Sequence, residues 1–357
     1  MVLPDPSRSQ RPREWTPARL TIARELRGLT RAQLANAIGK SAAAVGQFES
    51  GVIQPYAHVA RAIASALSVP IDFLHRAPAV RVLSADDHFV RPSRAVTRIA
   101  RRRSAAISMV LVEVYQQLTK ETVREAQVPR VRLSAGAAAL FELIAEGLRA
   151  QWDLANAPIA NMVALLEARG IVVGQVDDRQ APTGSCSTGH GDQPWVLLAA
   201  SAGTASQARI DAAHELGHLV VMHAGEDLAA PEAERQADRF ALAFLMPSRE
   251  FELDVPTRVT QSALGILKRR WGVPMADMAR RAHDLSLLSD ASFQRSHARL
   301  NSARARLAEP DEPTTESPST LLGALTAARD TGALEVVLEA TGMTKGLLRE
   351  LLGPSAV

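Results

Sequence analysis

The stretch AAHELGHLVV, residues 212–221, contains side chains that together could hold a metal ion and hydrolyse an amide bond. On an α-helix, His214 and His218 lie one turn apart, so both imidazoles can reach one ion. Glu215 then lies beside that ion, where its carboxylate can take a proton from metal-bound water that attacks a carbonyl carbon. The spacing predicts a hydrolytic metal site; an ordinary amphipathic helix that carries two histidines is the alternative.

A third ligand is expected among the acidic residues that follow, which are Glu226, Asp227, Glu232, Glu234 and Asp238. In the helix predicted over residues 231–247, Glu234 and Asp238 lie at the edge of the apolar face, whereas Glu232 points outward. An unpaired carboxylate in a half-buried position is costly, and a nearby cation removes that cost. We expect Glu234 to be the third ligand and Asp238 to accept a hydrogen bond from a ligand histidine. Glu226 and Asp227, in the connecting loop, remain alternatives.

The predicted donor set suits Zn²⁺, although Mn²⁺ or Fe²⁺ could bind the same nitrogen and oxygen ligands. His223 is expected near the end of the metal-binding helix, where an imidazolium favours the helix dipole, and is not expected to be a ligand. His190 lies in a predicted loop and could approach a substrate oxygen, and Asp211 either touches the site or is solvated. These residues are weaker candidates than the histidines of the motif.

The elements that must position this site are helices and short strands. Residues 204–225 predict one long helix, followed by the helix over 231–247. The Val- and Leu-rich segments 171–176 and 194–200 predict strands, and the turn-rich connection between them could hold another short strand around 185–187. If residues 194–200 formed an exposed sheet edge, that strand could align an extended peptide by main-chain hydrogen bonds.

Composition places the chain among globular proteins of two or three domains, because its 357 residues are 46% hydrophobic and 22% charged. A single cysteine, Cys186, excludes an internal disulfide framework and an all-cysteine zinc site. The chain has no run of apolar residues long enough for a membrane span and no signal peptide, so a cytoplasmic location is expected. Residues 91–103 hold six arginines and no acid, which suits either a phosphate backbone or a solvated face.

Residues 17–74 predict four or five short helices separated by capping residues and glycines. The segment LTRAQLANAIGKSAAAVGQFESG resembles the XRE family of lambda-repressor-like helix-turn-helix domains. The resemblance implies that residues 41–50 form a recognition helix in the major groove of DNA. The expected DNA-facing residues are Arg31, Gln33, Lys40, Ser41, Ala42, Ala43 and Gln47. Two of them are alanines where hydrogen-bonding side chains usually read bases, but alanine can contact thymine methyl groups.

Residues 152–250 resemble the ImmA/IrrE family of metallopeptidases. The resemblance rests on the HELGH motif and on the run E-x-x-A-D/N-x-F-A-x-x-L-M-P, here Glu234 to Pro247. It implies a compact zincin-like fold with His214, His218 and Glu234 as metal ligands and Glu215 as general base. It also implies a role in transcription, because members of this family cleave XRE-type repressors.

The expected fold is multidomain and mainly α: an all-α helix-turn-helix bundle, an α+β zincin-like metallopeptidase domain with a small sheet, and a helical C-terminal region. The expected order is a disordered N-terminus (1–16), the XRE domain (17–76), a basic linker and helix (77–133), the metallopeptidase domain (134–255), a helical extension (256–307), a flexible linker (308–320) and a small helical tail (321–357).

These features favour a DNA-binding transcription regulator with a zinc-dependent endopeptidase domain that cleaves an XRE-type repressor or itself. Double-stranded operator DNA and a protein substrate are the expected partners; a homodimer is possible and a membrane is not expected. One alternative is a regulator whose peptidase-like domain senses a ligand or metal without catalysis. Another is an adaptor that uses the XRE fold for protein contacts, and DNA binding that weakens with salt would argue against it.

Overall fold

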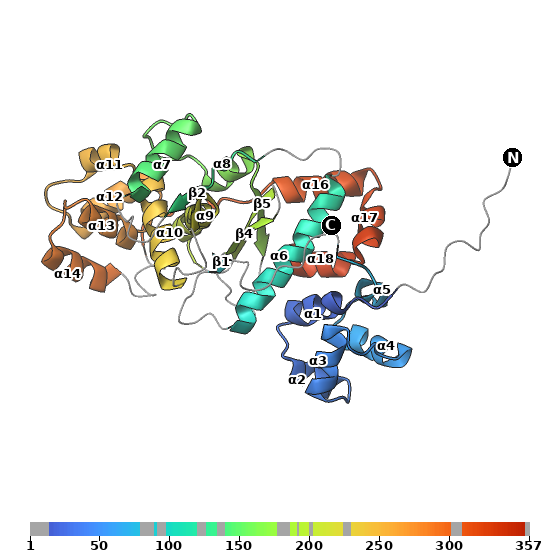
Figure 1. Ribbon diagram of the computed structural model, residues 1–357. Coiled ribbons are helices and arrows are strands. Elements are labelled where there is room, and N and C mark those ends of the chain that lie inside the picture. Colours follow the sequence, from blue (N-terminus) through green and yellow to red (C-terminus); the bar gives the residue numbers. More distant parts are fainter. Residues whose placement is uncertain are drawn as a thin grey trace. The chain divides into compact units, whose positions relative to one another are not determined.

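The computed structural model describes residues 14–78, 89–90, 98–119, 126–133, 140–176, 186–190, 193–199, 203–223, 230–300 and 309–353. The fold is mainly α-helical, as predicted, with a helix-turn-helix bundle at the N-terminus and a small mixed sheet further along the chain (Figure 1). The chain divides into two compact units. Unit 1 comprises residues 1–87, 97–123 and 322–357, and unit 2 comprises residues 88–96 and 124–321.

Unit 1 begins with five helices: α1 (Pro17–Leu26), α2 (Arg31–Ala37), α3 (Ala42–Ser50), α4 (Ala57–Ala66) and α5 (Ile71–Leu74). Thr30 starts α2 with a capping box in which its side chain and that of Gln33 each bond the other's backbone N–H. Ser41 starts α3 by accepting a hydrogen bond from the backbone N–H of Ala44, and Gly51 ends it with a φ of 74°. These caps fix the turn between α2 and α3.

The remainder of unit 1 consists of the long helix α6 (Arg98–Leu118) and the C-terminal helices α16 (Thr320–Asp330), α17 (Leu334–Thr341) and α18 (Lys345–Leu352). A buried ion pair joins α1 to α6, with Arg19 Nη2 and Glu113 Oε1 2.5 Å apart. Gly342 has a φ of 71°, and a Cβ there would lie 2.9 Å from the Cα of Phe73. The C-terminal tail is thus packed closely against the end of the helix-turn-helix bundle.

Unit 2 contains a four-stranded sheet in the order β1-β4-β5-β3. Its strands are β1 (Phe89–Val90), β3 (Val172–Val176), β4 (Cys186–His190) and β5 (Gln193–Ala199). Strand β5 is parallel to β3 and antiparallel to β4. The suggestion that residues 194–200 form an exposed edge is therefore wrong, since β5 is paired on both sides. Continuous burial from Gln193 to Leu198 is typical of such an interior strand.

Unit 2 also contains helices. They are α7 (Leu140–Gln151), α8 (Met162–Ala168), α9 (Ala205–Val220), α10 (Ala230–Leu245), α11 (Ser248–Asp254), α12 (Gln261–Trp271), α13 (Met275–Asp284) and α14 (Asp290–Leu300). One buried apolar cluster runs through them and includes Trp152, Leu216, Phe240 and Trp271. Helices α8 and α9 pack against the sheet. Among the described residues, no helix combines the length and the apolar character needed to cross a bilayer.

The helix that carries the HELGH motif is shorter than predicted. Helix α9 ends at Val220, and the next three residues form strand β6 (Val221–His223), which pairs in parallel with β2 (Val131–Leu133). The expected continuation of one helix to residue 225 is therefore wrong. Periodicity did not reveal the change, because Val220 and Val221 fit an apolar helix face and a strand equally well.

The segment 308–320 was expected to be a flexible linker, but its described part, residues 309–320, is bonded to the body of unit 2. We call these residues the acidic strap. Glu309 Oε2 accepts hydrogen bonds from Lys268 Nζ at 2.7 Å and from the backbone N–H of Met275. Glu312 also bonds Lys268 and accepts from the backbone N–H of Ser206 at 2.9 Å. Acidic residues at these helix starts complement the helix dipoles.

The third glutamate of the strap, Glu316, bonds the start of α8 and a residue of α9. Glu316 Oε2 accepts from the backbone N–H groups of Met162 and Val163, and its other oxygen pairs with the buried Arg209 of α9 at 2.6 Å. Strap contacts thus fix α9 both at its N-terminus and one turn further along. The prolines and acids that resemble a linker in sequence serve here to hold an extended chain against helix ends.

Lys268→Met is expected to lower the free energy of unfolding of unit 2 by about 3–5 kcal/mol, because it leaves two glutamates without their buried cation. Urea unfolding followed by tryptophan fluorescence measures this, since Trp152, Trp195 and Trp271 are buried in unit 2. The matched control is Arg269→Met, whose exposed pair with Asp311 contributes about 1 kcal/mol or less. Equal losses in the two variants would contradict a stabilising role for the buried pair.

Candidate metal centre

Close packing of α9 on α10 brings the two halves of the site together. A Cβ on Gly217 would lie 3.1 Å from the Phe240 ring and 3.2 Å from the Cα of Ala237. A larger residue would force Phe240 or the backbone of Ala237 to move by a few tenths of an ångström, so the glycine favours this close approach at the centre of the motif. The approach places the acidic edge of α10 beside the histidines of α9.

Three donor groups converge at this point. The Nε2 atoms of His214 and His218 are 3.1 Å apart, and Glu234 Oε2 is 3.1 Å from His214 Nε2. The other oxygen of Glu234 is 3.4 Å from His218 Nε2. One ligand atom from each residue lies within 4.8 Å of the others, so a single ion could contact all three. Two imidazole nitrogens and a carboxylate oxygen form a donor set that fits Zn²⁺.

Asp238 lies on the far side of His214, where the sequence predicts it. Its Oδ1 is 2.9 Å from His214 Nδ1, and in the tautomer with the proton on Nδ1 the ring donates to this carboxylate while the Nε2 lone pair faces Glu234 and His218. Arg280 of α13 lies 3.8 Å from the other oxygen of Asp238. This arginine is 42 residues further along the chain than Asp238, and nothing in the motif pointed to it.

The protonation states of the site suit a cation. Burial lowers the pKa of His218, against the opposing effect of Glu234, so its imidazole is neutral near pH 7. Burial alone would raise the pKa of Glu234, but hydrogen bonds from His214 and His218 outweigh it and lower the pKa to about 2. A neutral imidazole and an ionised carboxylate are the forms in which these side chains bind metals.

Glu215, the predicted general base, is fully buried on α9 directly after His214. Asp211 lies one turn earlier and accepts a hydrogen bond from Gln207 at 2.9 Å. Glu232 points outward, as expected, and pairs with the exposed Arg235. His190 ends β4 and His223 ends β6. The alternative ligands Glu226 and Asp227 lie outside the described residues.

The predicted DNA-facing residues all lie on the exposed surface of α2, α3 and the turn between them: Arg31, Gln33, Lys40, Ser41, Ala42, Ala43 and Gln47. Three of them also have local bonds. Gln33 and Ser41 cap α2 and α3, and the Nε of Arg31 is 2.6 Å from the buried Glu49. Glu49 also binds Arg24, so one buried carboxylate orients two arginines.

Comparison with family models agrees with both halves of this description. Residues 20–74 match the helix-turn-helix family model. Residues 167–283, which include α9, α10 and all but the last residue of α13, match the model of a peptidase family described as the IrrE N-terminal-like domain. No curated protein matches the chain. The chain therefore carries a helix-turn-helix region followed by a region similar to the IrrE N-terminal-like peptidase domain.

Proposed function

We propose that this protein is a transcription regulator that binds double-stranded DNA and cleaves peptide bonds of a protein substrate at a zinc site formed by His214, His218 and Glu234. The observation that carries the proposal is the convergence of these three donor atoms beside the buried Glu215. The proposed substrate is an XRE-type repressor or the chain itself, because the peptidase-like domain is fused to a domain of that type. A DNA-binding role also supports the cytoplasmic location expected from the sequence.

Each residue of the site has a different role in the proposed hydrolysis. When bound, a zinc ion supplies Lewis acidity that acidifies water and polarises the substrate carbonyl. Glu215 accepts a proton from the water whose oxygen forms the new bond to the carbonyl carbon. As the C–N bond breaks, the same carboxyl group returns that proton to the leaving amine nitrogen. Asp238 keeps the ring of His214 in the orientation and tautomer that a metal ligand needs.

The test uses the full-length protein loaded with zinc. It is incubated with purified XRE-type repressors and, in a separate reaction, alone, and new termini are identified by mass spectrometry. Cleavage that a chelator stops and zinc restores would support the endopeptidase. Binding to duplex DNA that changes with metal loading, without any cleavage, would instead support a regulator with a non-catalytic sensing domain. Absence of both would refute the proposal.

A further inference from the structure

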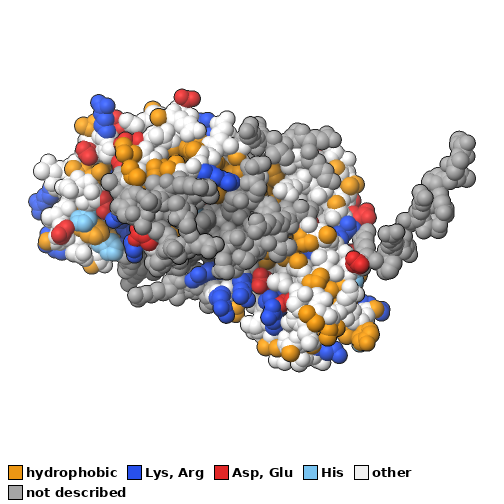
Figure 2. Space-filling view, viewed as in Figure 1, with side chains coloured by type: hydrophobic (Ala, Val, Ile, Leu, Met, Phe, Trp, Pro, Cys, Tyr) orange, Lys and Arg blue, Asp and Glu red, His pale blue; other side chains and the backbone are white. Residues whose placement is uncertain are grey.

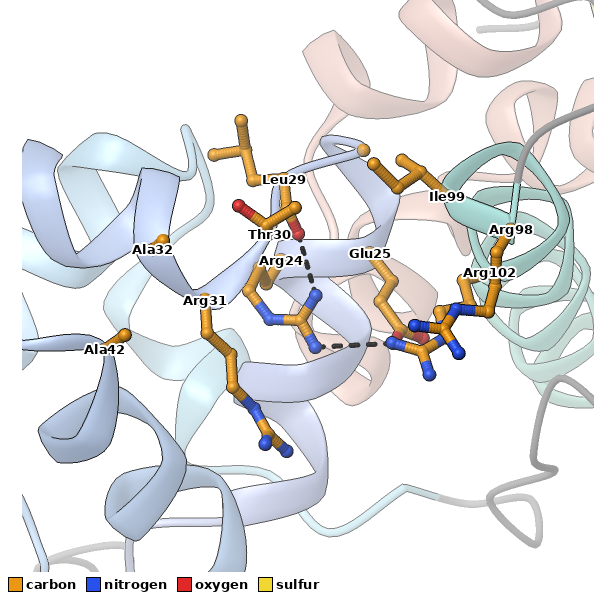
Figure 3. A pocket seen from close by; sticks show the side chains of 11 residues that line it. Arg24, Glu25, Leu29, Thr30, Arg31, Ala32, Ala42, Arg98, Ile99 and Arg102 are labelled. Carbon is orange, nitrogen blue, oxygen red and sulfur yellow. Dashed lines mark hydrogen bonds and ion pairs between the residues drawn. The ribbon is translucent and has the colours of Figure 1, made fainter.

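A basic groove lies within unit 1 at the start of α6. It has a volume of about 740 Å³ and is lined by the end of α1, the starts of α2 and α3, and the first turns of α6. Figure 3 shows Arg24 and Arg31 on one side and Arg98 and Arg102 on the other. Figure 2 shows Lys and Arg side chains gathered over the start of α6 and the adjoining helix-turn-helix bundle.

The start of α6 is held in place by contacts with α1. Arg103 donates through Nε to the carbonyl of Leu26 at 2.8 Å, and Arg102 lies 3.9 Å from Glu25. Gly28, in the turn after α1, has a φ of 63°, and a Cβ there would make ordinary contact with Arg103 and Ile99 at 3.6 and 3.7 Å, so this turn lies against α6. The groove is thus formed by packed elements of one unit, and α6 belongs to the same surface as α2 and α3.

Positive charge exceeds negative charge in the groove. Among the described residues, four arginines and one acid, Glu25, line it, and the buried Glu49 pairs with Arg24 and Arg31. The side chains of Arg31 and Arg102 are 57% and 43% exposed, whereas that of Glu25 is only 13% exposed. The rim of the groove is therefore cationic, and its one carboxylate lies deeper.

The helix dipole does not account for the arginines at the start of α6. Its first six residues, RIARRR, contain four arginines, and its first turn has no acid. Positive charge at a helix N-terminus opposes the helix dipole and destabilises the helix at low salt. An anionic partner at this position would reverse that effect.

We propose that the start of α6 is a second DNA-contacting element, in which Arg98 and Arg102 bind phosphates of the same duplex that α3 enters. The inference rests on the DNA binding proposed above and extends it to residues outside the helix-turn-helix domain. Ala42, at the start of α3, lines the same groove, so a duplex that meets α3 brings its backbone next to α6. Phosphate contacts supply affinity without reading sequence.

Helix α3 has few side chains that can bind bases, so contacts of α6 with phosphates would add to a low affinity for DNA. Its first turn begins with Ala42, Ala43 and Ala44, which offer no hydrogen bonds to base edges. A recognition helix of this kind gains less binding free energy from bases than one that carries polar side chains there. Backbone contacts from a neighbouring basic helix offset that deficit.

The test compares three full-length proteins by fluorescence anisotropy with a random-sequence duplex of about 30 base pairs over a series of KCl concentrations. The proteins are the wild type, Arg98→Gln/Arg102→Gln, and the matched control Arg329→Gln/Arg349→Gln, which removes the same charge from exposed positions on α16 and α18. Thermal unfolding of each verifies that the variants are folded. We expect the α6 variant to lose about 1.8 from the magnitude of the salt slope and to bind roughly tenfold or more weakly near 0.1 M KCl.

The outcomes separate this inference from the proposed function. Absent or salt-insensitive binding by the wild type would overturn DNA binding itself. Wild-type binding with an α6 variant that matches the control in slope and affinity would overturn only the role of α6. A weaker variant with an unchanged slope would overturn it as well, because lost phosphate contacts must reduce counterion release.

Discussion

Glu215→Gln is expected to lower kcat for cleavage of a verified protein substrate by roughly 10²- to 10⁴-fold, the usual contribution of a general base. The amide keeps the size of the side chain in its buried position on α9 but cannot accept the proton of the attacking water. Bound zinc and the affinity for duplex DNA should stay unchanged, because Glu215 is not one of the three converging ligands.

The matched control is Glu232→Gln, which makes the same chemical change on the outer side of α10, where the carboxylate pairs with Arg235. Its kcat should equal that of the wild type. Rates from time courses of fragment formation, with metal content measured on the same samples, compare the two variants. Undiminished cleavage by Glu215→Gln would remove Glu215 from the mechanism, and an equal loss in both variants would point to damage to the fold.

The parts of the site that one helix carries could be predicted from the sequence. The positions of His214, Glu215 and His218 on one helix depend only on local periodicity, which holds wherever the segment is helical. Glu234 and Asp238 also lie where the amphipathic pattern of their helix placed them, one beside both histidines and the other on His214 Nδ1. Whether these residues bind metal and catalyse hydrolysis stays a prediction.

Features that depend on pairing between distant segments could not be predicted in this way. Strand β5 gives no local sign of which neighbours it pairs with, so the sequence left an edge position open although β3 and β4 enclose the strand. The end of α9 at Val220 depends on β2, nearly ninety residues earlier. Arg280 approaches Asp238 only because α13 folds back on the site.

The acidic strap shows that amino-acid composition alone does not distinguish a flexible linker from a segment held by ion pairs to distant residues. Prolines, threonines and glutamates are typical of flexible linkers, and nothing nearby in the sequence marks Lys268 or Arg209 as their partners. A buried lysine in α12 and a buried arginine in α9 are the signals that could have been followed, since such residues need acidic partners. Which glutamates pair with this lysine and this arginine, however, can be seen only in the folded structure.

Glu234→Ala is expected to reduce co-purified zinc from about one ion per chain to background, because a site with two histidines alone lacks the third protein ligand of catalytic zinc centres. Mass spectrometry of protein purified without added metal or nickel measures the content and identifies the metal, including Mn²⁺ or Fe²⁺. Glu232→Ala is the matched control and should retain the ion. Asp238→Asn should weaken zinc affinity roughly 10- to 100-fold through its effect on His214.

The other possible results of the metal measurement would change the assignment of the ligands or of the metal site itself. Zinc retained by Glu234→Ala would transfer the third-ligand role to Asp238, Glu226 or Asp227. No metal in the wild type, even after reconstitution with zinc, would mean that the close donors serve only as a buried hydrogen-bond cluster. A cluster of this kind cannot activate water, so the protein would then act on transcription through DNA and ligand contacts alone.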